Sequence, residues 1–182
     1  MKRAKKIFLM NHYSYLWNIV LFFIDLLPPV LRNMVLRLMF DNFGKLSFLD
    51  YKTYWRYPRR ISIGDYTSIN RGCGIYPSFF VKEATIRIGD HVVLAPNVTL
   101  FSATHDYSDI KLPNTAQSII IENHVWIGGN TTILPGITIG EGAIIGAGSV
   151  VSKDIPAWTV SVGNPARVIY ERETTQGDCS IN

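Results

Sequence analysis

The sequence predicts an all-β fold, a parallel β-helix of three-sided coils with a helical segment at its N-terminus. Aliphatic residues recur at every sixth position from Ile121 to Val151. A second set of mostly small or β-branched residues recurs at every sixth position from Val125 to Ile155. An α-helix repeats its apolar residues about every 3.6 positions and a strand about every 2, so a period of six indicates a stacked coil. Each repeat then forms one short strand, and about 18 residues complete one turn.

The spacing can be followed from residue 63 to residue 151 and predicts about four coils. Their leading core residues are Ile63, Ile69 and Ile75; Ile88, Leu94 and Leu100; Ile121, Ile127 and Ile133; and Ile139, Ile145 and Val151. Residues 76–87 and 101–118 interrupt the spacing, and interruptions in a solenoid form surface loops, where we expect the functional groups. Residues 46–60, rich in aromatic and basic side chains, are expected to form a lead-in strand or cap. The chain thus divides into a helical segment (1–45), the β-helix (46–170) and a tail (171–182).

The composition is that of one globular domain, with 182 residues of which 47% are hydrophobic. The net charge is unevenly distributed: residues 1–60 carry +8 and residues 61–182 carry −4. An anionic partner is therefore expected at the N-terminal end. Cys73 occupies an inward position of the coil and Cys179 lies in the tail, so we expect no structural disulfide and a reducing, cytoplasmic compartment.

The N-terminal segment contains an apolar run from Leu16 to Ile24. No small-residue cleavage site follows it, and it is well short of the roughly 20 residues that span a bilayer, so we expect neither a signal peptide nor a spanning helix. From Pro29 onward the apolar residues predict an amphipathic helix, with Arg32 and Arg37 off its apolar stripe. The stripe either packs on the coil or on a neighbouring subunit, or it contacts anionic lipid at the inner face of the membrane. Nucleic acid is not expected, because no binding motif accompanies the charge.

Four segments carry a family resemblance: residues 125–129, 133–136, 145–156 and 163–167. Together they resemble the hexapeptide-repeat acetyltransferases, especially the galactoside and maltose O-acetyltransferases and the sugar O-acetyltransferases of bacterial surface-polysaccharide pathways. The resemblance covers about residues 61–169. It implies a left-handed parallel β-helix, a homotrimer with active sites between subunits, and acetyl-CoA as the acyl donor.

The resemblance also implies roles for individual residues. His105 follows the segments 88–91 and 95–100 and matches the family's active-site histidine. Histidine has a reference pKa of about 6.5 and can take the proton of an alcohol that attacks a thioester, so His105 is the expected general base. The backbone N–H of Gly129 matches the donor to the developing oxyanion, an interaction worth roughly 3 to 4 kcal/mol in the transition state. The residues that match the acetyl-CoA contacts are Ala147, Ser152, Lys153 and Arg167, of which the last two can meet its phosphates by charge.

On the acceptor side, the resemblance implies saccharide contacts for Asn70, Glu83 and Trp126. Each has a simpler alternative: Asn70 can bond the neighbouring coil, Trp126 can fill a corner, and Glu83 lies where the match is poor. Lys153 and Arg167 can likewise be ordinary exposed charges. The residues beside His105 that can also contact acceptor hydroxyls are Asp106, Tyr107 and Asp109. The chain departs from the galactoside enzymes at Tyr170, where they have a second basic residue; here a basic residue, Arg172, follows two positions later.

The remaining histidines are not expected to act in catalysis. His12 lies in the N-terminal segment, and His91 and His124 stand at positions that predict corners of the coil. The gaps between His91, His105 and His124 do not match a zinc-bearing β-helix, so we expect no metal. The predicted function is acetyl transfer from acetyl-CoA to a saccharide hydroxyl in surface-polysaccharide synthesis. Two alternatives remain: an acetyltransferase for an antibiotic or amino-sugar acceptor, and a non-catalytic scaffold.

Overall fold

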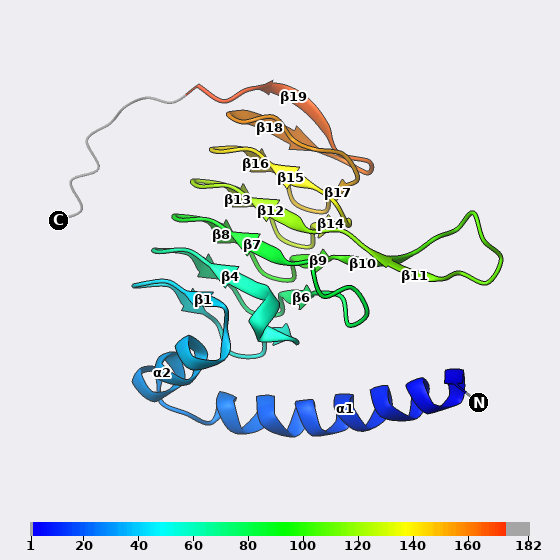
Figure 1. The fold of residues 1–182 in the computed structure, drawn as a ribbon. Helices are drawn as coiled ribbons and strands as arrows, with labels where there is room; N and C mark the ends of the chain where they lie inside the picture. Colours follow the sequence, from blue (N-terminus) through cyan, green and yellow to red (C-terminus); the bar gives the residue numbers. More distant parts are fainter. Residues whose placement is uncertain (1, 174–182) are drawn as a thin grey trace.

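The computed structural model of the protein describes residues 2–173 and is a left-handed β-helix with two helices at its N-terminal end (Figure 1). Parallel strands form three sheets, which are the three sides of the rod. Sheet A contains β1 (Asn42–Phe43), β4 (Ile61–Ile63), β7 (Ile86–Ile88), β12 (Ile119–Ile121) and β15 (Thr138–Ile139). Sheet B contains β2 (Phe48–Leu49), β5 (Ser68–Ile69), β8 (Val93–Leu94), β13 (Trp126–Ile127) and β16 (Ile144–Ile145), followed by β18 and β19. Sheet C contains β3 (Tyr54–Trp55), β6 (Gly74–Tyr76), β9 (Thr99–Phe101), β14 (Thr132–Ile133) and β17 (Val150–Val151).

The residues predicted from the six-residue spacing form the core. All twelve leading residues, from Ile63 to Val151, are buried, as are the second set from Val125 to Ile155. Fully burying one such aliphatic side chain stabilises a fold by about 1.5 to 3 kcal/mol. Backbone hydrogen bonds join each coil to the next, for example from the Gly64 N–H to the Ile88 carbonyl at 2.8 Å. The repeat therefore fixes the register of every coil.

The β-helix has one coil more than predicted. Strands β1 to β3 pair with β4 to β6 and form a complete first coil, where a lead-in strand or cap was expected. Its core residues are Phe43, Leu49 and Trp55, which are also six apart and are buried. Phe43 and Trp55 are aromatic where the later coils have aliphatic residues, so the first coil keeps the spacing but differs in composition.

Helix α1 (Lys2–Asp25) lies across the base of the first coil (Figure 1). One face contacts the coil through residues at helical spacing, Tyr13, Trp17, Leu21 and Ile24. The Trp17 ring meets the Trp55 ring edge-on at 5.3 Å, and its indole N–H donates to the Trp55 carbonyl. The helix thereby covers the end of the core, as the open end of a solenoid requires. Neither α1 nor α2 combines the length and hydropathy needed to cross a bilayer among the residues described.

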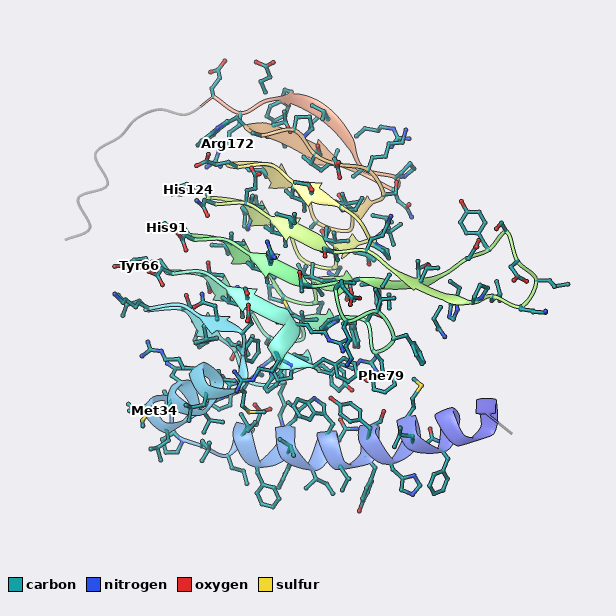
Figure 2. All side chains as sticks on the ribbon, viewed as in Figure 1. Met34, Tyr66, Phe79, His91, His124 and Arg172 are labelled. Atoms are coloured by element: carbon teal, nitrogen blue, oxygen red, sulfur yellow. The ribbon has the colours of Figure 1, made fainter. Side chains whose placement is uncertain are left out.

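Helix α2 (Pro29–Met39) divides its apolar stripe: Val35 and Met39 pack against the core, as expected for packing on the coil, whereas other members of the stripe face outward. Val30, Met34 and Leu38 are exposed, whereas Arg32 is buried and points inward. Its guanidinium donates to the carbonyls of Leu49 and Asp50, forms an ion pair with Asp25 at 3.3 Å and lies 4.5 Å from the Tyr51 ring centre. The arginine therefore joins α2 to the first coil. Figure 2 shows Met34 at the outer surface of the base.

The edge between sheets A and B carries a column of stacked rings. Tyr66, His91 and His124 occupy equivalent corners of successive coils, with ring centres 4.9 and 5.0 Å apart (Figure 2). All three have positive φ, as tight corners require. In the next coil Gly142 has φ +66°, and a Cβ there would lie 2.4 Å from the Trp158 ring. The two histidines are thus corner residues, as predicted.

The edge between sheets C and A carries the long insertions. Short corners join the later coils there, but residues 77–85 separate β6 from β7, and residues 102–118 separate β9 from β12. The first coil is followed at this edge by a 3₁₀ turn, η1 (Pro58–Arg60). At the far end of the rod, β18 (Thr159–Val162) pairs with β16, and β19 (Arg167–Glu171) turns back antiparallel to β18. Most of the tail expected at 171–182 lies outside the described residues.

Candidate active site

The interruption at 101–118 forms a β-hairpin arm that projects from the rod (Figure 1). Its strands are β10 (Ala103–His105) and β11 (Asn114–Ala116), and they pair antiparallel with His105 opposite Asn114. The buried Ser102 holds its base: the Ser102 N–H donates to the Tyr76 carbonyl at 3.1 Å, and its Oγ accepts from the Ser78 N–H at 2.9 Å. The arm and the 77–85 insertion are therefore joined at their roots.

His105 lies at the end of β10 with its ring oriented by a backbone carbonyl. Its Nδ1 is 2.9 Å from the carbonyl oxygen of Leu112, which sits in the turn of the same arm. A carbonyl only accepts, so Nδ1 carries the proton and donates, and Nε2 keeps its lone pair. This arrangement suits a histidine that accepts a proton through Nε2. The group that orients the ring is therefore a backbone carbonyl.

His105 lines a cavity of about 260 Å³ at the C/A edge. The arm contributes one wall through Thr104, His105, Asn114 and Thr115. Outward-facing rings of sheet C, Tyr76 and Phe101, form another, with ring centres 5.1 Å apart. Residues 77–80 and Met10 of α1 complete it. The cavity therefore combines a proton acceptor, small polar groups and flat aromatic rings.

A cation also lines this cavity. The Arg56 guanidinium lies 5.1 Å from the centre of the Tyr76 ring, and within residues 2–173 it forms no ion pair with a carboxylate. Burial raises the pKa of the neighbouring Tyr57 and of Tyr76. Sequence reasoning missed Arg56, Tyr57, Tyr76 and Phe101 as site residues. The available signal was the presence of large aromatic residues at outward positions next to the two insertions.

The acidic residues of the arm serve its turns. The Asp106 carboxylate accepts from the Ser108 N–H at 2.9 Å and from its hydroxyl at 2.6 Å, and these bonds lower the pKa of Asp106. Asp109 accepts from the Lys111 N–H at 2.8 Å. Tyr107 is almost fully exposed at the tip. None of the three contacts His105, although Asp106 and Tyr107 line a shallow depression on the other side of that ring.

Several of the predicted site residues lie on a different edge of the rod, between sheets B and C. Gly129 and Ala147 occupy equivalent corners there, and the Gly148 N–H donates to the Gly129 carbonyl at 2.8 Å. The Gly129 N–H has no hydrogen-bond partner within residues 2–173, so it is available as a donor. Trp126 lies on the outer surface of sheet B with 47% of its side chain exposed, so it does not fill a corner. Asn70 precedes the same edge and donates from Nδ2 to the Leu94 carbonyl at 2.7 Å, which is the coil-to-coil bond considered as its alternative.

The other predicted contacts are dispersed. Ser152 and Lys153 follow β17 on the C/A edge, two coils beyond the arm, and both are exposed. Arg167 begins β19, is exposed, and donates to the Ala166 carbonyl at 2.9 Å. Glu83 is exposed in the 77–85 insertion and does not line the His105 cavity. One chain thus brings His105 together with none of the predicted cofactor residues.

Cys73 and His12 are each held by neighbouring parts of the fold. Cys73 is fully buried, and burial raises the pKa of its thiol to about 11. His12 bonds the Phe8 carbonyl one turn back in α1 at 2.8 Å. Among the described side chains, no three His, Cys, Asp or Glu residues lie close enough to hold a metal ion.

Comparison with known proteins agrees with this architecture. Residues 118–153 match the family model "Bacterial transferase hexapeptide (six repeats)". The chain is 38% identical over 143 residues to the galactoside O-acetyltransferase of Escherichia coli K12, covering 77% of this chain and 68% of that protein. It is 33% identical over 152 residues to a protein of the same organism that is provisionally named as a colanic acid biosynthesis acetyltransferase, covering 82% and 81%.

Solved structures give the same result. A hexapeptide-repeat acetyltransferase of Vibrio cholerae, solved in complex with acetyl coenzyme A, superposes with a TM-score of 0.78 at 31% identity, covering 86% of this chain and 85% of that one. A galactoside acetyltransferase in complex with coenzyme A superposes with a TM-score of 0.76 at 34% identity, covering 86% and 78%. The chain therefore belongs to the hexapeptide-repeat acetyltransferase family and is an acyltransferase.

Proposed function

We propose that the protein transfers the acetyl group of acetyl-CoA to a hydroxyl of a saccharide, with His105 as general base. The observation that carries this proposal is the Nδ1–Leu112 hydrogen bond of 2.9 Å beside the cavity, because it leaves Nε2 free to accept a proton. The acceptor oxygen attacks the thioester carbonyl, its proton passes to Nε2, and the CoA sulfur leaves and takes that proton. The products are an acetyl ester and free CoA, and no covalent acyl-enzyme is needed.

The Gly129 N–H serves as donor to the oxyanion that forms during the attack. It is a backbone group at a corner whose position is fixed by the coil, and its N–H makes no hydrogen bond within the described chain. A donor that needs no rearrangement stabilises the transition state more than the ground state.

Acetyl-CoA is the proposed co-substrate, held by Ala147, Ser152, Lys153 and Arg167. Lys153 and Arg167 are exposed, and neither is paired with a carboxylate in the part of the chain described, so both are free to meet phosphate oxygens. Ala147 is exposed at a corner, where a small residue leaves room for an extended ligand along the coils. The chemistry of these residues fits the cofactor bound in the two related structures.

The active site forms between subunits of a homotrimer in this proposal. His105 lies at the C/A edge, whereas Gly129 and Ala147 lie at the B/C edge, and sheet C lies between these edges. Parallel rods around a threefold axis bring different edges of neighbouring subunits together. Each of the three sites would then take His105 from one subunit and Gly129 and Ala147 from the next.

Subunit mixing tests this arrangement. His105→Ala removes the base, and Ala147→Trp fills the corner proposed for the cofactor; both positions are exposed, so both variants should fold. Coexpression at equal levels should restore about a quarter of the wild-type activity, since a site works only when each subunit supplies its intact half. A mixture as inactive as the two separate variants would show that each chain builds its own site.

The activity itself is tested by incubating the protein with acetyl-CoA and a panel of acceptors. The panel contains neutral sugars, amino sugars and aminoglycosides, and products are detected by mass. Ester products on neutral sugars support the proposal. Amide products on amino groups alone would replace it with the amino-acceptor alternative.

The saccharide is proposed to belong to surface-polysaccharide synthesis in the cytoplasm, in line with the provisional name of the colanic acid relative. A peripheral membrane contact is part of this proposal. The outer faces of α1 and α2 form a basal apolar surface of exposed side chains: Phe8, Leu16, Phe22, Phe23, Leu26, Val30, Leu31, Met34 and Leu38. Figure 2 shows Met34 of this surface directed away from the coil. The +8 charge of residues 1–60 favours an anionic bilayer.

Flotation with anionic phospholipid vesicles tests the membrane contact. Phe22→Glu together with Met34→Glu should abolish flotation, because it places two carboxylates on the basal apolar surface. Tyr107→Glu together with Ile110→Glu adds the same charge at the exposed tip of the arm and serves as the matched control. Equal flotation of both double variants would remove the membrane contact from the proposal.

A further inference from the structure

An apolar groove continues from the His105 cavity along α1. It has a volume of about 220 Å³ and is lined by Leu9, Met10, Tyr13, Tyr57 and Phe79, none of which carries a charge at neutral pH. Three of these residues, Met10, Tyr57 and Phe79, also line the His105 cavity. The two spaces are therefore adjacent and share part of their lining.

The groove is built by ring packing between α1, the first coil and the 77–85 insertion. The Tyr13 and Tyr57 rings stack at 5.0 Å, and the Tyr57 and Phe79 rings lie 5.5 Å apart. Burial raises the pKa of Tyr13 to about 12, as expected for a phenol in apolar surroundings. Figure 2 places Phe79 between the coil and α1.

The lining is not closed against water. Leu9 is 58% exposed and Phe79 is 37% exposed, although both belong to a wall that is otherwise packed. Polar groups are confined to the other space, where His105, Arg56 and Asn114 lie. The lining thus changes from hydrogen-bonding groups in the His105 cavity to apolar side chains in the groove along α1.

This order matches a molecule with a saccharide at one end and a hydrocarbon chain at the other. We propose that the acceptor is an amphiphilic glycoside whose sugar lies beside His105 and whose apolar aglycone lies in the groove between α1 and Phe79. This inference rests on the proposed acetyl transfer to a saccharide and names the class of saccharide. The shared lining favours the aglycone as occupant, because it places the groove directly beside the cavity proposed for the sugar.

Helix α1 explains how such an acceptor would reach the site. The helix lines the groove with Leu9 and Met10, and residues farther along it form much of the basal apolar surface. A glycolipid in a bilayer beneath the protein would therefore meet the groove at the membrane side of the cavity.

The experiment compares methyl, butyl and octyl β-glycosides of one sugar as acceptors for the full-length protein, all below their critical micelle concentrations. kcat/KM should rise by about two- to fourfold for each methylene that enters the groove, mainly through KM. Leu9→Glu should flatten this dependence, because it puts a carboxylate into the groove without entering the His105 cavity. Leu16→Glu is the matched control: it lies on the same helix, is 59% exposed, and lines neither space.

Calorimetric titration of the octyl glycoside gives a readout that does not need turnover. Binding that is weakened by Leu9→Glu and kept by Leu16→Glu supports the groove, even if acetyl transfer itself fails. Equal kcat/KM for the three glycosides overturns the inference while leaving the proposed function intact. Loss of the chain-length dependence in both variants also overturns it. So does a change of oligomeric state in Leu9→Glu alone, which would assign the groove to a contact between copies of the chain.

Discussion

Replacing His105 with alanine should lower kcat by about 10²- to 10⁴-fold, the usual contribution of a positioned general base. This range corresponds to about 3 to 5 kcal/mol of transition-state stabilisation. The loss should come from chemistry, because the side chain is exposed and, among the residues described, makes a single hydrogen bond, from Nδ1 to the Leu112 carbonyl. Such a bond contributes only about 0.5 to 1.5 kcal/mol to folding. The assay is release of the CoA thiol at saturating acetyl-CoA, together with the melting temperature.

His91→Ala is the matched control for this change. His91 is also exposed, and its ring stacks with the rings of Tyr66 and His124 on the A/B edge. Its kcat should equal that of the wild type. If His105→Ala kept more than about a tenth of the wild-type kcat, the assignment of His105 as general base would be wrong.

The orientation of the ring can be measured separately. Nitrogen chemical shifts of the His105 side chain should show the Nδ1–H tautomer at a pH where the ring is neutral, because the Leu112 carbonyl can only accept. A neutral ring with its proton on Nε2 would contradict the proposed route of the proton.

Three further predictions concern the fold. Ile127→Ala should lower the free energy of unfolding by about 2 to 5 kcal/mol in urea titrations, since Ile127 is fully buried. Asp25→Asn should cost about 3 kcal/mol by the same measurement, because it leaves the charge of the buried Arg32 without its ion-pair partner. In a Cys179→Ser background, Cys73 should resist alkylation up to about pH 9 and react only on unfolding. Its pKa is raised to about 11 in the folded state, so stability should fall between pH 9 and 11, a decline that Cys73→Ala should reduce.

The coils could be predicted because burial in a stacked rod imposes one simple spacing. Ile121, Ile127 and Ile133 lie in the core for the same reason that they are six apart: each leads one strand of a three-sided turn. The first coil escaped prediction because two of its leading positions, Phe43 and Trp55, are aromatic and not the aliphatic residues that mark the later repeats. Its large rings fit because α1, with Trp17, closes that end of the core.

The orientation of α2 could not be read from its hydrophobic pattern. The pattern predicts that the apolar stripe faces protein, but only Val35 and Met39 pack on the core, whereas Val30 and Leu38 face outward and Arg32 faces the coil. The arginine is tolerated because carbonyls of the first coil, Asp25 and the Tyr51 ring surround it. These partners are distant in sequence, so the residues around Arg32 do not indicate that its buried guanidinium will have hydrogen-bond and ion-pair partners.

The residues of the candidate site likewise divide into those that the local sequence predicts and those that depend on contacts distant in sequence. His105 was predicted from the segment around it, and its position in a projecting arm follows from the interruption of the repeat. The Leu112 carbonyl, the Arg56 guanidinium and the rings of Tyr76 and Phe101 were not predicted, because their nearness to His105 depends on how the arm folds and how three coils stack. Side chains from different coils come together at one site only because the register of the coils places them side by side.

The rod itself is what brings the acceptor side of the site together. Met10, Phe79 and His105 belong to a helix, a short insertion and a long arm, and all three meet at one edge because the coils hold their roots in fixed register. The position of α1 then depends on the first coil, through Trp17 on Trp55 and Tyr13 on Tyr57. A change in that coil would therefore alter acceptor binding without touching His105. Under the proposed function, acceptor choice can vary through α1 and the insertions, while the spacing of the later coils keeps the proposed acetyl-transfer residues in place.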